Sequence, residues 1–215
     1  TAYEIGVRLV GSEMCIRDRH SYGRIDFSDE ENTGMEKYLE LEKEKQTVSR
    51  VEIPGHEASL LLTAFPGRTS ANTFSVKKMM SVFGLLEKER CSHFLSLVED
   101  DEFSYYCGKA LLEAEAKKRL INWVHLPIAD MDIPKNNTLD GLNKIRPNLV
   151  EAIKTDRSIA IHCMGGLGRS GTVAAIILAD LGMPIRSTLE VVRRFRPGAI
   201  ETRGQENFVL NSSLD

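Results

Sequence analysis

Short apolar runs alternate along the chain with segments whose apolar residues recur every three or four positions. Runs of this length, closed by glycine, proline or polar residues, predict buried strands. The predicted strands are residues 60–64, 93–98, 120–126 and 158–162. The helical spacing predicts helices over residues 75–89, 102–118, 138–154, 170–181, 187–195 and 202–210. This alternation is typical of an α/β fold in which helices flank a central, mainly parallel sheet.

The run Ser158–His162 is predicted to lie at the centre of that sheet. It is apolar at most positions, as expected for a strand that is covered on both faces. The helix that follows, residues 170–181, is almost wholly apolar and is expected to be buried. Pro147 falls inside the helix predicted over residues 138–154 and marks a candidate kink.

The first 47 residues do not follow this pattern. The stretch from Arg8 to Asp18 resembles translated sequencing-adapter DNA, so we treat residues 1–19 as non-native. A native but irregular N-terminus is the alternative. Residues 28–46 are crowded with Asp, Glu and Lys and predict a solvated, disordered arm or a surface helix, with a partner-binding segment as the alternative. One compact domain is predicted over residues 48–215.

Composition narrows the range of partners and compartments. The chain has 215 residues, 42% hydrophobic and 27% charged, with a net charge of -3, so we expect neither nucleic acid nor a membrane as a partner. The longest apolar run, residues 173–181, is too short to span a bilayer. Four irregularly spaced cysteines and no visible secretory signal favour a reducing, cytoplasmic location.

A glycine-rich loop joins the predicted central strand to the apolar helix. Its sequence from residue 162 is His-Cys-Met-Gly-Gly-Leu-Gly-Arg-Ser-Gly-Thr. A helix N-terminus binds anions, and glycines let successive N–H groups point inward. The fork of Arg169 matches two phosphate oxygens. The predicted phosphate-binding residues are Met164, Gly165, Gly166, Leu167, Gly168 and Arg169.

Cys163 is the predicted nucleophile of this loop. A cysteine at a helix N-terminus beside an arginine favours the thiolate form, which attacks phosphate and forms a phosphocysteine. Ser170 is expected to donate a hydrogen bond to the sulfur and to ease its departure. His162 is expected to pack beneath the loop and bond its backbone. The predicted phosphatase is independent of metal ions, and no cofactor is predicted.

Two nucleotide-binding loops are the alternatives. A P-loop needs Gly-Lys-Ser/Thr, and Arg169 stands where its lysine would be. Residues 166–171 match the Gly-x-Gly-x-x-Gly dinucleotide fingerprint, but the acid expected about twenty residues later is Glu190, inside a predicted helix.

From about Val48 to its end the chain resembles the protein tyrosine and dual-specificity phosphatases, most of all the cyclin-dependent-kinase-associated phosphatase group. The motifs that carry the resemblance are residues 162–170, 64–67, 127–130 and 196–200, with Gln205. The resemblance implies the dual-specificity phosphatase fold and a general acid on a mobile loop. Asp130 is the candidate acid. The family usually has small residues just after this aspartate, whereas Met131 and Asp132 follow it here, so Asp132 is the alternative. Gln205 matches a water-positioning side chain, with an exposed helical glutamine as the alternative.

The sequence thus predicts a phosphatase that acts on phosphotyrosine, and on phosphoserine or phosphothreonine if its specificity is dual. Neutral Met164 and Leu167 favour a phosphorylated protein over a phosphoinositide. A phosphoinositide or small-molecule phosphatase and a non-catalytic phosphate-binding module are the alternatives. A basic cluster, Arg193, Arg194, Arg196 and Arg203, predicts a solvated helix face or a steering patch. Cys91 and Cys107 are expected to pack in the interior, with a disulfide to Cys163 as the alternative.

Overall fold

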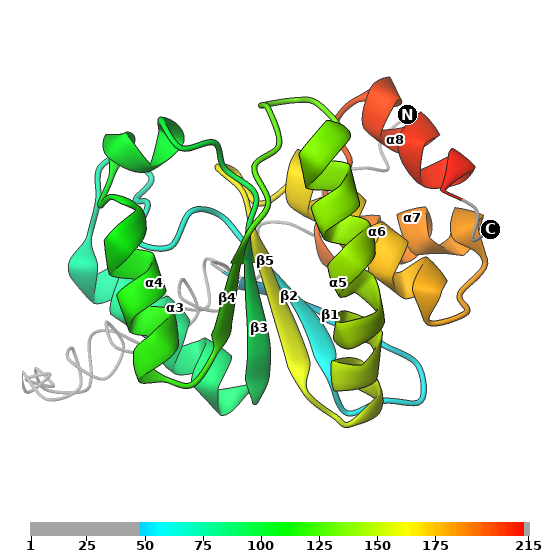
Figure 1. Cartoon of the computed structure of the whole chain (residues 1–215), viewed down its shortest axis with the longest axis horizontal. Helices are drawn as coiled ribbons and strands as arrows, with labels where there is room; N and C mark the ends of the chain where they lie inside the picture. The colour runs from blue at the N-terminus through cyan, green and yellow to red at the C-terminus, as the bar shows by residue number, and fades with distance from the viewer. Residues whose placement is uncertain (1–47, 213–215) are drawn as a thin grey trace, which may run out of the picture. The chain divides into compact units, whose positions relative to one another are not determined.

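The computed structural model describes residues 48–212, and the predicted adapter-like stretch and charged arm lie outside them. Five strands form one sheet in the order β1-β2-β5-β3-β4 (Figure 1). Their bounds are Val48–Glu52 (β1), Ser59–Thr63 (β2), Cys91–Ser96 (β3), Asn122–His125 (β4) and Ser158–His162 (β5). Only β1 is antiparallel to its neighbour, and β5 is central with parallel partners on both sides. The predicted α/β fold with a mainly parallel sheet is therefore confirmed.

The edge strand β1 was missed by the sequence analysis. Its buried residues, Val48 and Val51, are separated by polar residues, so β1 has no continuous apolar run. It becomes a strand by pairing with β2, and its side chains face the interior only at intervals. The predicted strand 120–126 is shorter than expected, because Leu120 has a φ of +57° and is 91% exposed.

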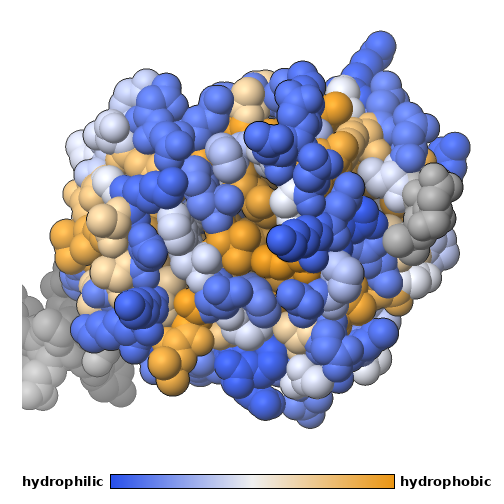
Figure 2. All heavy atoms as spheres, in the orientation of Figure 1, coloured by the Kyte–Doolittle hydropathy of each residue, from blue (hydrophilic) through white to orange (hydrophobic). Residues whose placement is uncertain are grey.

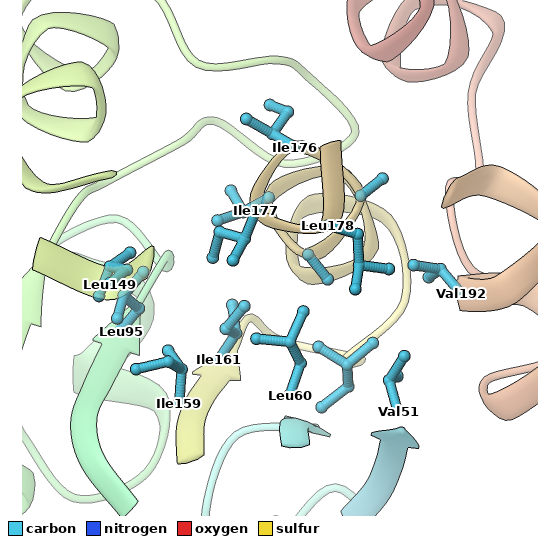
Figure 3. Close-up of a cluster of buried hydrophobic side chains, with 14 of the residues drawn as sticks. Val51, Leu60, Leu95, Leu149, Ile159, Ile161, Ile176, Ile177, Leu178 and Val192 are labelled. Atoms are coloured by element: carbon cyan, nitrogen blue, oxygen red, sulfur yellow. The ribbon is translucent and has the colours of Figure 1, made fainter. Parts of the chain in front are cut away.

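Helices cover both faces of the sheet (Figure 1). Helices α3 (Val76–Lys88) and α4 (Lys109–Lys118) contribute to the buried cluster that includes Leu61 and Phe94. The other face packs against α5 (Asn136–Lys154), α6 (Gly168–Asp180), α7 (Ile185–Phe195) and α8 (Arg203–Asn211). Figure 3 shows the centre of this second cluster, where Ile159 and Ile161 of β5 approach α6. Because strand side chains alternate between faces, Ala160 belongs to the first cluster.

The prediction of a single helix over residues 102–118 is wrong. The segment holds a 3-10 helix, η2 (Glu102–Tyr105), and then α4, which begins after Gly108 at a φ of +69°. Glycine adopts this left-handed conformation without steric cost, and it allows the chain to change direction there. Pro147 lies inside α5, which continues to Lys154.

The parallel strands bring their carboxyl ends to one edge of the sheet. The loop after β5 lies at this edge and leads into the N-terminus of α6. In open α/β sheets this edge is the usual location of ligand sites. Within residues 48–212, no helix combines the length and the apolar character that crossing a membrane requires.

Candidate active site

The loop from Cys163 to Arg169 curls around the sulfur of Cys163. The Cys163 side chain is buried, and its Sγ accepts a hydrogen bond from the Gly166 N–H at 3.1 Å. The hydroxyl oxygen of Ser170 lies 3.6 Å from the same sulfur. The loop is therefore not extended, and the Gly166 amide points at the predicted nucleophile.

Position 166 requires a glycine because of its backbone conformation and because a side chain there would clash with neighbouring backbone atoms. Its φ is +71°, and a Cβ there would lie 2.5 Å from the backbone nitrogen of Ala64. Any side chain would push the loop away from the end of β2. Gly168 also lies in a crowded position, since a Cβ there would lie 2.5 Å from Oε2 of Glu201.

Two arginines bind the carbonyl groups of the loop from outside. Arg196 donates from Nε to the Gly166 carbonyl at 3.1 Å and from Nη2 to the Gly165 carbonyl at 3.2 Å. Arg68 donates from Nη1 to the Met164 carbonyl at 2.9 Å. In a trans peptide the C=O and the following N–H point in opposite directions. Outward carbonyls therefore direct the next three N–H groups toward the sulfur side of the loop.

The predicted basic cluster is thus divided by the fold. Arg196 binds the loop, and burial lowers its pKa. Arg193 donates to the carbonyl oxygens of Ala199 and Ile200 and pairs with Glu206 at 2.8 Å. The solvated-face interpretation is therefore wrong for Arg196, whereas the Arg193 side chain is 41% exposed, and Arg194 and Arg203 are also exposed.

Arg169 is buried, with its guanidinium held on several sides. It pairs with both carboxylate oxygens of Glu102, at 2.6 and 2.9 Å, and donates to the Ile128 carbonyl at 3.0 Å. Its Nη2 also lies 3.0 Å from Oδ1 of Asp130. Burial alone would lower the pKa of Arg169, but the hydrogen bonds that it donates to Glu102 and the nearby negative charges raise it overall. Arg169 is therefore a fixed positive charge.

Glu102 was missed by the sequence analysis. An acidic residue at a predicted helix start resembles an ordinary partner of the helix dipole, and no local motif marks it. In the structure it is buried, and its Oε2 also accepts from the Glu99 N–H at 2.7 Å. Only its contact with Arg169, 67 positions away, reveals a role in the site.

The two candidate acids lie in different environments. Asp130 faces Arg169 and has a side chain that is 70% exposed. Asp132 accepts from Lys135 at 2.5 Å and from the Ile133 N–H at 2.8 Å. The hydrogen bond from Lys135 is the main cause that lowers the pKa of Asp132. Asp132 is thus engaged within its own loop, and Asp130 is the carboxylate directed toward the site.

Gln205 anchors the loop that carries both aspartates. Its side chain is buried, which contradicts the alternative of an exposed helical glutamine. Its Oε1 accepts from the backbone N–H groups of Glu201 and Thr202, at 2.9 and 3.3 Å. Its Nε2 donates to the Asp132 carbonyl at 3.1 Å. The N-terminus of α8 and the aspartate loop are therefore joined through one amide.

His162 packs beneath the loop within an aromatic layer. It stacks on Phe94 with ring centroids 5.0 Å apart. Ser96 accepts from the Trp123 indole N–H at 2.8 Å, so its own hydroxyl hydrogen is available to His162 Nε2 at 2.6 Å. The remaining ring nitrogen, Nδ1, then donates to the Cys163 carbonyl at 3.2 Å. Burial lowers the pKa of His162 to about 3, so the ring is neutral.

The other two described cysteines are free thiols. Burial raises the pKa of Cys91 to about 12 and that of Cys107 to about 11. Cys91 pairs with Ser158, at the start of β5, whereas Cys163 follows its end. Five residues of strand correspond to about 16 Å, and a disulfide needs Cα atoms within about 7 Å. The alternative of a Cys91–Cys163 disulfide is therefore wrong.

A cysteine six residues before an arginine, in a loop between a central strand and a buried helix, defines the class of cysteine-dependent phosphatases. Within this class the chain belongs to the family described as "Swiss Army Knife protein, DSP-PTPase phosphatase domain", which residues 91–209 match. The resemblance stated from the sequence is thereby confirmed.

Individual proteins of this class are similar to the chain. Human cyclin-dependent kinase inhibitor 3 is 38% identical over 111 residues, which cover 50% of this chain and 50% of that protein. Mouse protein tyrosine phosphatase type IVA 2 is 28% identical over 98 residues, covering 45% and 58%. The chain thus spans about half the length of these relatives.

Solved structures have the same fold. The crystal structure of kinase associated phosphatase gives a TM-score of 0.63 at 27% identity and covers 75% of this chain and 90% of that chain. Tk-PTP in its active form gives 0.55 at 31% identity, covering 75% and 93%. The dual-specificity phosphatase fold implied by the resemblance is therefore confirmed.

Proposed function

We propose that the chain is a phosphoprotein phosphatase that acts through a phosphocysteine intermediate. It hydrolyses phosphotyrosine and, with dual specificity, also phosphoserine and phosphothreonine. One observation carries the proposal. The Cys163 sulfur lies within hydrogen-bond distance of the Gly166 N–H, in a loop that Arg169 closes. Amide dipoles and a guanidinium stabilise the charge of a transferring phosphoryl group.

The first step transfers the phosphoryl group to the enzyme. The Cys163 thiolate attacks phosphorus, an S–P bond forms, and the bond from phosphorus to the leaving oxygen breaks. The protonated carboxyl of Asp130 gives its proton to that oxygen, which leaves as a hydroxyl group. The contact of Asp130 with Arg169 supports this role, because a phosphate bound by Arg169 would lie beside the carboxyl group.

The second step releases inorganic phosphate. A water molecule gives its proton to the Asp130 carboxylate and attacks phosphorus, while the S–P bond breaks and the sulfur leaves as a thiolate. The Ser170 hydroxyl, 3.6 Å from the sulfur, stabilises the departing charge. The resemblance implies a water-positioning role for Gln205, and its hydrogen bonds support a positioning role through the aspartate loop.

A protein substrate is favoured over a phosphoinositide. Met164 and Leu167 are neutral, so within the loop Arg169 is the one side chain that offers positive charge. A multiply phosphorylated headgroup would need further cations there. Mouse protein tyrosine phosphatase type IVA 2, a relative by sequence, is named for phosphotyrosine, which supports the same substrate class. The free thiols support a reducing, cytoplasmic location.

Substrate release assays test the proposal. The full chain is incubated with an aryl phosphate, a panel of phosphotyrosine, phosphoserine and phosphothreonine peptides, and phosphoinositide vesicles. We expect phosphate from the aryl phosphate and the peptides. Cys163→Ser is expected to release none and to retain bound phosphopeptide. Asp156→Asn is the matched control, because Asp156 lies in the turn before β5, at the edge of the sheet away from the site.

Two results would contradict the proposal. Release from the vesicles alone would indicate a phosphoinositide phosphatase. Folded protein that binds phosphopeptide and releases no phosphate from any substrate would indicate a non-catalytic binding module.

A further inference from the structure

Met131 is an exposed apolar residue in a strained backbone conformation. Its φ is +60°, and the residue is 51% exposed. It is the third residue of a turn that the Asp132 N–H closes onto the Ala129 carbonyl at 3.1 Å, a position where φ above zero favours glycine. A non-glycine residue in this conformation costs free energy, so the surrounding contacts must hold the turn.

The turn places Met131 at the rim of the active site. Met131 follows Asp130, whose carboxylate lies 3.0 Å from Arg169. Its backbone is held from the opposite side, since Thr202 Oγ1 donates to the Met131 carbonyl at 3.4 Å. The residue that follows the candidate catalytic carboxyl group is therefore held by its backbone and half exposed to solvent.

Large exposed apolar side chains are few in the described residues. The surface in Figure 2 is mostly hydrophilic, with separate apolar areas. Among residues 48–212 the large exposed ones are Val76, Tyr105, Leu120 and Met131. Tyr105 belongs to η2, the helix that also carries Glu102, and Glu102 binds Arg169. Both segments that present a carboxylate to Arg169 thus also present an apolar side chain to solvent.

We propose that Met131 is a specificity-determining residue that contacts an apolar side chain next to the phosphorylated residue of a protein substrate. The inference rests on the proposed function and specifies its substrates. Such a contact removes the exposed half of one methionine from water, which corresponds to a preference of about fivefold.

Peptide pairs and matched variants of the full chain test the proposal. Two phosphotyrosine peptides differ only in the residues on either side of the phosphotyrosine, leucine in one and serine in the other. The ratio of their kcat/KM values is measured for the wild type, Met131→Asn and Met131→Leu, since asparagine tolerates positive φ. Leu120→Asn is the control, because Leu120 has the same φ sign, is exposed, and precedes β4 at the opposite edge of the sheet.

We expect a preference of about fivefold for the leucine peptide in the wild type, in Met131→Leu and in Leu120→Asn. Met131→Asn is expected to lose this preference. A preference that persists in Met131→Asn, or is absent from the wild type, would overturn the inference. An aryl phosphate assay in parallel separates the two proposals. Turnover of the aryl phosphate without a peptide preference overturns the inference alone, whereas no turnover of any substrate overturns both.

Discussion

Glu102 holds Arg169 by both of its carboxylate oxygens, at 2.6 and 2.9 Å, in a region where neither side chain is exposed. The pair joins η2, on one side of the sheet, to the first turn of α6. A bidentate contact fixes the plane of the guanidinium as well as its position. Glu102 therefore orients Arg169 before a phosphate binds, and a preorganised positive charge of this kind stabilises a phosphoryl group in transfer.

The Glu102 contact is expected to support both stability and turnover. Glu102→Gln removes the buried charge that pairs with Arg169, so the free energy of unfolding should fall by about 3 kcal/mol. Loss of orientation should also lower kcat/KM by about a hundredfold. Denaturant unfolding and aryl phosphate turnover measure the two effects. Asp100→Asn is the control, since it removes an exposed pair with Lys109; equal effects of the two variants would contradict the prediction.

Arg196 is expected to shape the phosphate-binding loop. Arg196→Met keeps the length of the side chain but removes the donors to the carbonyls of Gly165 and Gly166. Loss of charged hydrogen bonds should weaken binding of inorganic phosphate, measured as a competitive inhibitor, by about tenfold. Arg194→Met, an exposed substitution in the last turn of α7, just before Arg196, should leave the inhibition constant near that of the wild type. An unchanged constant in Arg196→Met would argue against this role.

Gly166 and Gly165 form a matched pair for testing the loop backbone. Gly166→Ala combines an unfavourable φ with a clash against β2, so it should lower the free energy of unfolding by at least about 2 kcal/mol. Gly165 has open space at its Cβ position and no positive φ. Gly165→Ala should therefore unfold close to the wild type. Similar midpoints for the two variants in a denaturant titration would contradict the described loop.

Asp130 and Asp132 are expected to differ most on substrates with poor leaving groups. Asp130→Asn should lower kcat for a phosphoserine peptide by about a hundredfold or more, because the serine oxygen needs a proton to leave. An aryl phosphate with an acidic phenol should be affected much less. Asp132→Asn should have the smaller effect on the phosphoserine peptide, since Asp132 is bound to Lys135. The reverse order would make Asp132 the general acid.

His162 should make stability depend on pH. Burial lowers the pKa of His162 from 6.5 to about 3, so between these values the unfolded chain binds more protons than the folded state. The stability that neutral His162 contributes is complete above about pH 6.5 and is lost as pH falls, by about 1.4 kcal/mol per unit. Unfolding free energies from pH 6 to 4 measure the slope. His162→Gln should flatten it, and parallel slopes would refute the prediction.

The sequence by itself determined the elements and the loop that carries the chemistry. The runs at β2, β3, β4 and β5 are apolar enough to be recognised locally, and α3, α5, α6, α7 and α8 follow from helical spacing. The residues from His162 to Ser170 are contiguous, so one strand, one turn and one helix start are sufficient to bring the cysteine and the arginine together. Interactions between neighbours in sequence can therefore be predicted without knowledge of the tertiary structure.

Only the tertiary structure decided which distant residues complete the site. Glu102 reaches Arg169 across 67 positions, and Arg68 reaches the Met164 carbonyl across 96. Neither contact has a local signature in the sequence, because an acidic or basic residue at the end of a helix or strand usually interacts with solvent or with a helix dipole. Asp130 likewise meets Arg169 only through the fold, since the approach of α6 brings their side chains to 3.0 Å, whereas Asp132 pairs with Lys135 within its own loop.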